Sequence, residues 1–236
     1  MNTQSNTYTI IYSSIMVLVV GAALAFVYQV LKPTQDENVA NDKRQQILSA
    51  IHVVAPEGQV GVTYDKYITD EFLTDLQGSR VEGDAFGVNM SSEVKKPEGE
   101  RKLPVFVATT DEAKTVYVLP VYGAGLWGPI WGYVAVEEDG DTIYGAYFSH
   151  SGETPGLGAE IATENFQLQF VGKELYKDGK FRSVDVKKAG QKPIDNADYV
   201  DAISGGTITS TGVQSMLADC LKLYDAFLNN LQTEKN

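Results

Sequence analysis

The sequence has one cysteine, Cys220, and two histidines among its 236 residues. A single cysteine excludes an internal disulfide framework and any cysteine-ligated metal cluster. His52 and His150 lie far apart in the chain without other ligands at metal-binding spacing, which argues against a zinc site. Basic residues are also scarce, because 19 lysines and arginines stand against 31 acidic residues, giving a net charge of −12. Nucleic-acid binding needs basic surfaces that neutralise phosphates, so we expect no nucleic-acid partner.

Charged side chains are absent before Lys32, and residues 9–31 are almost wholly apolar. As a helix this run would reach about 35 Å, enough for a bilayer core. We therefore expect a short tail over residues 1–8 and a transmembrane helix over 9–31. The alternative is a cleaved signal peptide, favoured by Ala23-Leu24-Ala25, but no basic residue precedes the run and it continues past that site. The flanks carry too few basic residues to determine the orientation.

Helical patterns dominate the stretch that follows the apolar run. Apolar residues fall on one side of 36–51, and a second helical pattern covers 64–76. Residues 88–101 are polar and are expected to form a loop or an edge region. We therefore predict a helical membrane-proximal region over 32–101, followed by a core domain over 102–236.

From residue 102 onward the sequence changes to short runs rich in valine and aromatic residues, which are typical of strands. These runs are found at 104–108, 116–119, 131–136, 143–148 and 181–186. Asp139-Gly140-Asp141 reads as a hairpin turn, and 165–176 as a short helix or mixed segment. Strands mixed with helices around a hairpin predict an α+β fold with a largely antiparallel sheet.

Residues 201–213 combine hydroxyl side chains with glycines, and an apolar pattern with helical spacing follows from Val213 to Leu231. One interpretation is an ordinary loop in which Ser210 or Thr211 caps the helix. The other is a site for an anion, because free backbone N–H groups and the helix dipole favour a phosphate at such a turn. A nucleotide P-loop is excluded because no Gly-Lys-Ser/Thr sequence closes the segment.

Within this segment, Asp201-x-x-Ser204-Gly205-Gly206-Thr207 resembles the flavinylation motif of the FMN-binding domain family. In that family the last threonine forms a phosphoester with FMN, which a separate flavin transferase installs. The resemblance implies that Thr207 carries covalent FMN. The chain departs from the family at Gly206, where alanine is usual. Hydroxyl and amide groups of Ser204, Gly205, Gly206 and Thr209 would then surround the phosphate.

A second stretch, Glu153-Thr154-Pro155-Gly156-Leu157-Gly158, matches the family at every position. A type II turn would explain Pro155 and Gly156 but not their neighbours. In the family these residues lie against the flavin ring. The resemblance implies that Glu153 and Thr154 bond the polar edge of the ring and that the amides of Gly156 and Gly158 stabilise negative charge on it.

Leu157 and Trp127 would cover the face of the ring. Trp127 belongs to a glycine-rich stretch, 123–132. The other interpretation of that stretch is a bend between strands, with the tryptophan packed in the core.

In its single anchor and in these motifs, the chain resembles the C subunits of sodium-translocating NADH:quinone reductases. The G subunits of Rnf electron-transport complexes share the two motifs and are the nearest alternative. The resemblance covers roughly residues 119–231. It implies a flavoprotein that passes single electrons between neighbouring redox centres, with other membrane subunits as partners. It also implies a location in the bacterial inner membrane, with the FMN domain on the periplasmic side.

The sequence shows neither a nucleophile–base pair nor a Gly-x-Gly-x-x-Gly dinucleotide fingerprint. We therefore assign no catalytic residue, and we expect NADH oxidation to take place on another subunit. A function of a different class also stays open, namely a membrane-tethered module that holds a small anion without redox chemistry.

Overall fold

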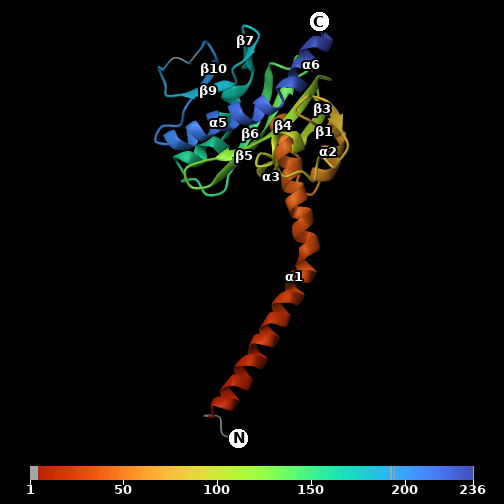
Figure 1. Ribbon diagram of the computed structural model, residues 1–236, viewed down its shortest axis with the longest axis vertical. Coiled ribbons are helices and arrows are strands. Elements are labelled where there is room, and N and C mark those ends of the chain that lie inside the picture. Colours follow the sequence, from red (N-terminus) through yellow and green to blue (C-terminus); the bar gives the residue numbers. More distant parts are fainter. Residues whose placement is uncertain (1–4, 192, 194, 236) are drawn as a thin grey trace. The chain divides into compact units, whose positions relative to one another are not determined.

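The computed structural model describes residues 5–191, 193 and 195–235 (Figure 1). The chain divides into two compact units, Met1–Lys43 and Arg44–Asn236. Helix α1 (Asn6–Ala50) forms the first unit, and its last turns belong to the second.

The first unit is the part of α1 that carries the long apolar run. Large apolar side chains from Ile10 to Leu31 are exposed along it. Among the described residues, α1 is the one helix long and apolar enough to cross a membrane. Pro33 lies inside the helix just after this run, where its ring removes one backbone donor. The helix fits a single-pass membrane anchor.

The second unit is built on a six-stranded sheet in which every neighbouring pair is antiparallel. Its spatial order is β2-β1-β3-β4-β5-β6. The strands are β1 (Ile68–Thr74), β2 (Arg80–Val81), β3 (Leu103–Thr109), β4 (Thr115–Ala124), β5 (Pro129–Glu137) and β6 (Ile143–His150). The predicted α+β fold with a largely antiparallel sheet is confirmed.

The predicted hairpin turn joins β5 and β6. Asp139 Oδ1 accepts hydrogen bonds from the amides of Asp141 and Thr142, each at 2.9 Å. Gly140 adopts a left-handed conformation with φ +67°, which a glycine tolerates without a steric penalty. The hairpin is therefore held by the side chain of its own first aspartate.

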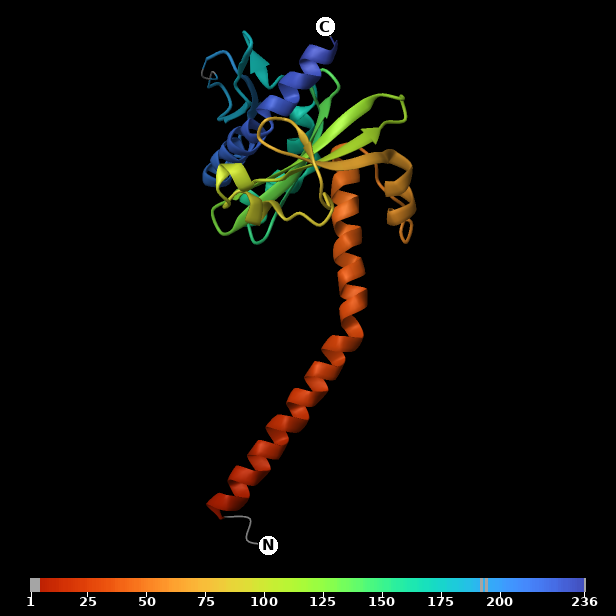
Figure 2. The same ribbon diagram turned by 45° about the vertical axis from the view of Figure 1, so that its right-hand side comes forward.

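Side chains along each strand point alternately to the two faces of the sheet, and both faces are buried. On β3, Leu103 and Val105 belong to one core cluster, while Phe106 and Ala108 belong to the other. Helices α5 (Thr207–Leu223) and α6 (Asp225–Lys235) cover the first face (Figures 1 and 2). The end of α1 and α2 (Val60–Tyr67) cover the second.

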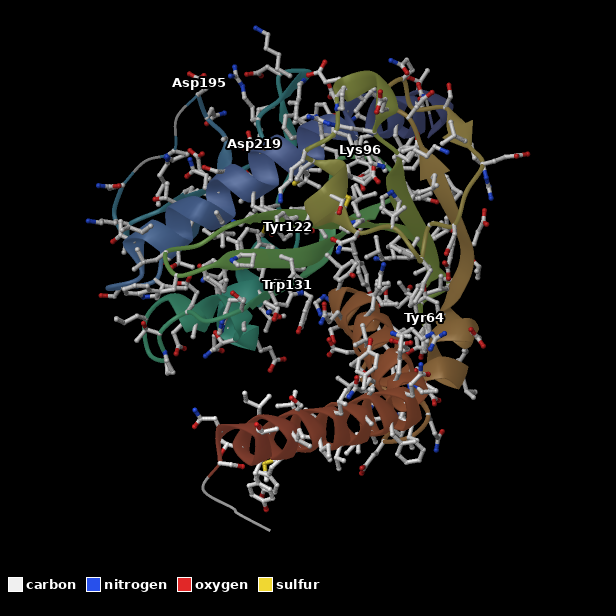
Figure 3. The ribbon with its side chains drawn as sticks, turned by 60° about the horizontal axis from the view of Figure 1, so that its bottom comes forward. Tyr64, Lys96, Tyr122, Trp131, Asp195 and Asp219 are labelled. Atoms are coloured by element: carbon white, nitrogen blue, oxygen red, sulfur yellow. The ribbon has the colours of Figure 1, made fainter. Side chains whose placement is uncertain are left out.

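Helix α1 ends in a Schellman motif at the edge of the second core cluster. The Val53 amide donates to the Leu48 carbonyl at 3.0 Å and the His52 amide to the Ser49 carbonyl at 3.1 Å, while His52 is left-handed with φ 61°. Trp131, labelled in Figure 3, donates its indole N–H to Gln46 Oε1 at 3.0 Å. These bonds connect the last turns of α1 to the sheet.

The helical prediction for residues 64–76 is wrong beyond Tyr67. From Ile68 the chain is strand β1, paired with β3. Tertiary structure overrides the helical spacing of the apolar residues here, because Ile68 and Leu73 become buried when this segment pairs with β3. The sheet therefore extends across the division predicted after residue 101, and 88–101 contains only the short helices α3 (Met90–Glu93) and η1 (Glu98–Glu100).

The C-terminal helix also begins earlier than predicted. Helix α5 starts at Thr207, so neither Ser210 nor Thr211 is its N-cap. The apolar pattern from Val213 to Leu231 covers two helices, because Tyr224 separates α5 from α6. The buried hydroxyl of Tyr224 donates a hydrogen bond to the Pro104 carbonyl at 3.0 Å. The remaining elements are η2 (Gly158–Ala162), α4 (Glu164–Gln167), η3 (Leu168–Phe170), β7 (Tyr176–Lys177), β8 (Lys180–Phe181), β9 (Val184–Lys187) and β10 (Asp198–Asp201).

Deleting residues 1–31 is expected to yield a folded domain that stays in solution without detergent and still accepts the flavin implied by the resemblance. The deletion removes the exposed apolar run but keeps Ile47 and Leu48, which are buried in the second core cluster. Deleting residues 1–51 should instead destabilise the domain by several kcal/mol, since each large apolar side chain contributes about 1.5–3 kcal/mol. Sedimentation and thermal unfolding of the two truncated chains check this. If the protein that lacks only residues 1–31 is unfolded, the predicted separation between the anchor and the folded domain is wrong.

Candidate functional site

A cavity of about 360 Å³ lies where three separate segments meet. These segments are the turn between β4 and β5, the loop after β6 and the start of α5. The lining residues are Leu126, Trp127, Glu153, Thr154, Leu157, Gly158, Gly205, Gly206, Thr207, Ile208 and Thr209. Tertiary structure thus brings together most of the residues singled out from the sequence.

Two predicted site residues lie outside the cavity wall, and two residues that line it were not predicted. Ser204 and Gly156 do not line the cavity. Leu126 and Ile208 do, and sequence patterns did not indicate them. Both are large apolar side chains beside a predicted site residue, and they are 49% and 59% exposed. Their position next to Trp127 and Thr207 is the signal that could have identified them.

The turn between β4 and β5 is closed by a hydrogen bond from the Gly125 amide to the Gly128 carbonyl at 2.8 Å. It holds Trp127 at the mouth of the cavity with 69% of the residue exposed. The interpretation that this tryptophan packs in the core is therefore wrong. The other tryptophan of the stretch, Trp131, points to the opposite face of the sheet and bonds Gln46.

The loop after β6 contains the predicted turn around Pro155 and Gly156. The Leu157 amide donates to the Thr154 carbonyl at 3.1 Å. Gly156 is left-handed with φ +75°, as the third position of a type II turn requires. This turn places Thr154 and Leu157 on the cavity wall.

The start of α5 provides the third side of the cavity. Gly206 is the N-cap and Thr207 the first helical residue. The first-turn N–H groups point toward the N-terminal end of the helix, and the glycine N-cap has no side chain that could accept hydrogen bonds from them. Thr207 is exposed, while Thr209 is buried. A hydroxyl is therefore accessible at the positive end of a 17-residue helix.

Glu153 lies on the cavity wall and accepts hydrogen bonds from the other two segments at once. Its residue is 5% exposed. Oε2 accepts the Thr209 hydroxyl at 2.6 Å, and Oε1 accepts the Trp127 amide at 2.8 Å. Burial alone would raise the pKa of this carboxyl, but the hydrogen bonds from Thr209 and Trp127 and the nearby His150 outweigh it and lower the pKa below the ordinary value. The carboxylate form is thus the one that the site stabilises.

Two glycines make room for this carboxylate. A Cβ added to Gly158 would lie 2.3 Å from Glu153 Oε2 and 2.5 Å from Thr209 Oγ1. A Cβ added to Gly125 would lie 2.5 Å from Glu153 Oε1. These distances are shorter than any normal contact, so a side chain at either glycine would displace the carboxylate.

A smaller cavity of about 240 Å³ adjoins the first and shares Thr207 with it. Its wall includes Lys187, Lys188 and Gln214. A larger cavity of about 500 Å³, lined by residues such as Arg101 and Cys220, contains none of the predicted site residues. The first cavity therefore remains the candidate site.

The sequence matches the FMN-binding domain family over residues 125–222, a stretch that contains all three segments of the cavity. The chain is 33% identical over 225 residues to the C subunit of the Na(+)-translocating NADH-quinone reductase of Haemophilus ducreyi, covering 89% of this chain and 85% of that one. It is also 33% identical over 238 residues to the C subunit of the same reductase from Neisseria meningitidis, covering 92% and 89%.

Two crystal structures are similar to this chain. The C subunit of the reductase from Parabacteroides distasonis superposes with a TM-score of 0.79 at 47% identity, covering 84% of this chain and 96% of that one. NqrC from Shewanella oneidensis gives a TM-score of 0.69 at 29% identity, covering 83% and 99%. The motifs, the fold and these relatives agree, and the chain belongs to the family of Na(+)-translocating NADH-quinone reductase C subunits.

Proposed function

We propose that this chain is a membrane-anchored electron-transfer subunit that carries FMN through a phosphoester to Thr207. The observation that carries the proposal is the position of Thr207. It is the exposed first residue of α5 and lies on the wall of the cavity formed by the three family motifs. The names of its relatives support a sodium-translocating reductase over an Rnf-type complex.

The residues of the site fit such a group. The first-turn amides and the dipole of α5 favour a phosphate at Thr207. Gly205 is left-handed with φ +76°, and a Cβ there would lie 2.6 Å from Leu157 Cδ2, so the backbone can pass close to the cavity wall. Leu126, Trp127 and Leu157 offer apolar surface suited to an aromatic ring.

FMN supplies the electron-transfer chemistry when bound, and the protein holds and tunes it. Thr207 provides the alcohol, so the cofactor would stay attached through repeated cycles without tight non-covalent affinity. The apolar residues around the cavity limit contact with water. Glu153, by contrast, has each carboxylate oxygen bonded within the protein, which makes it a poor candidate for a direct bond to the polar edge of the ring.

The proposal extends to the surroundings of the chain. Its partners are other membrane subunits of the reductase, which exchange single electrons with it and oxidise NADH, and a flavin transferase that attaches FMN. The domain lies on the periplasmic side of a bacterial inner membrane. The apolar run of α1 supports the anchor, and the family names support the partner subunits.

Co-expression with a flavin transferase tests the proposal. We expect a yellow protein whose colour persists after denaturation and whose intact mass increases by the mass of FMN less one water. A transferase that modifies a known acceptor in the same cells but leaves this chain colourless would contradict the proposal. A flavin that is released on denaturation would instead favour a binding module without the covalent bond.

A further inference from the structure

We propose that Glu153 is a positioning residue, whose carboxylate holds the three segments of the cavity in register and thereby sets the Thr207 hydroxyl for flavin attachment. The inference rests on the proposed function of Thr207. It assigns Glu153 a role that differs from the direct contact with the flavin ring expected from the sequence.

The first support is the geometry of the two hydrogen bonds. One oxygen of Glu153 bonds the backbone amide of Trp127 at 2.8 Å and the other bonds the side chain of Thr209 at 2.6 Å. The three residues come from three segments far apart in the sequence. A single buried carboxylate therefore connects the β4–β5 turn, the loop after β6 and α5.

The second support is the position of Thr209 in the helix. Thr209 is the third residue of α5 and Thr207 the first. Within one helical turn the backbone is rigid, so a bond that fixes Thr209 also fixes the place of Thr207. Thr209 is only 2% exposed, and its hydroxyl proton is donated to Glu153.

The third support is the packing around the carboxylate. Gly125 of the β4–β5 turn and Gly158 of the loop after β6 each lie against one of its two oxygens, at distances that leave no room for a side chain. The backbones of Gly206 and Gly158 also lie close together, because a Cβ added to Gly206 would lie 3.3 Å from the Gly158 amide nitrogen. The loop after β6 and the N-terminus of α5 are thus in close contact beside the carboxylate.

Positioning matters because a small displacement of a reacting group is costly. Misplacing it by about 1 Å can slow a reaction by roughly a hundredfold. Loss of the bond between Glu153 and Thr209 would free the start of α5 from the loop and let the Thr207 hydroxyl sample other positions. Flavin attachment should therefore become slower when the bond between Glu153 and Thr209 is lost, even in a protein that remains folded.

The test measures the initial rate of covalent flavin attachment by intact mass, with purified flavin transferase, a flavin dinucleotide as the donor and full-length protein in detergent. The Thr207 oxygen forms the new bond to the FMN phosphorus, the pyrophosphate bond of the donor breaks, and a nucleoside monophosphate leaves with the proton of the threonine. Each rate is normalised to the folded fraction from near-ultraviolet circular dichroism. Thr209→Val keeps the shape but removes the donor, and it should slow attachment by roughly tenfold or more. Thr209→Ser restores the hydroxyl and should return the rate to within about threefold of the original.

Glu153→Gln keeps the shape and one acceptor oxygen for the Trp127 amide, and the Thr209 hydroxyl can rotate to accept from the new NH₂ group. It should also attach flavin within about threefold of the original rate, whereas Glu153→Ala should be at least as slow as Thr209→Val, because it loses the bonds to both Thr209 and Trp127. Since Glu153→Ala already breaks the bond to Thr209, the double variant Glu153→Ala/Thr209→Val should be no slower than Glu153→Ala alone.

Attachment at the original rate in Thr209→Val would overturn the inference, as would failure of Thr209→Ser to restore it. If Glu153→Ala does not fold, Thr209→Val and Thr209→Ser still decide the matter. The proposed function fails separately, if the unaltered protein takes up no covalent flavin or if Thr207→Ala takes it up. The visible spectrum of each modified variant adds a second readout, since a displaced ring changes its absorption.

Discussion

Replacing Thr207 by alanine is expected to give a folded protein without any covalent flavin. The hydroxyl of Thr207 is the only part of the side chain that the phosphoester needs, and the residue is exposed. Substitutions at exposed positions usually change the free energy of unfolding by less than about 0.5 kcal/mol, so the loss would not reflect unfolding. Intact mass and in-gel flavin fluorescence after co-expression with the transferase measure it.

The matched control is Thr211→Ala, which removes an exposed hydroxyl one helical turn after Thr207. This variant should be modified fully. Thr209→Ala should also become modified at long reaction times, although slowly, because its hydroxyl serves Glu153 and not the cofactor. Covalent flavin on the Thr207→Ala variant would show that another residue is the attachment site.

Gly158→Ala should have the second largest effect, because it places a methyl group against the buried carboxylate. The new Cβ would lie 2.3 Å from Glu153 Oε2, and the carboxylate is held by Thr209 and Trp127 and cannot move without losing a bond. Overpacking of this kind typically destabilises a protein by about 1–3 kcal/mol. We expect a lower free energy of unfolding and strongly reduced flavin attachment.

Gly152→Ala is the control, in the same loop and with the same chemical change. No atom lies within 4 Å of a Cβ at Gly152, so this variant should unfold and accept flavin like the original protein. Urea unfolding and intact mass compare the two variants. Equal stability and equal flavin uptake in both would show that the carboxylate is not confined as the distances indicate.

The sequence alone could predict those features that depend on local pattern. The uncharged run over 9–31 predicts an anchor because its length and composition need no tertiary partner. Asp139-Gly140-Asp141 predicts a hairpin since the aspartate side chain bonds the amides of its own turn. The left-handed Gly156 was likewise expected, as a type II turn requires it. The resemblance over residues 153–158 and 201–207 pointed to the flavin and, among the hydroxyls, to Thr207.

Other features were decided only by residues far apart in the chain. Residues 68–74 have a helical spacing but form β1, because pairing with β3 buries them on the sheet. Trp127 was open to interpretation as a core residue, yet its turn extends beyond the sheet and leaves it exposed.

The environment of the candidate site was decided in the same way. Glu153 and Thr209 lie 56 positions apart and meet only in the fold. The resemblance of residues 201–207 to the family's motif identified the candidate attachment residue, whereas tertiary structure determined which hydroxyl is accessible and which is buried. The reason is physical: local propensities set turns and helices within a few residues, but burial and the partners of a carboxylate depend on the segments that fold against it.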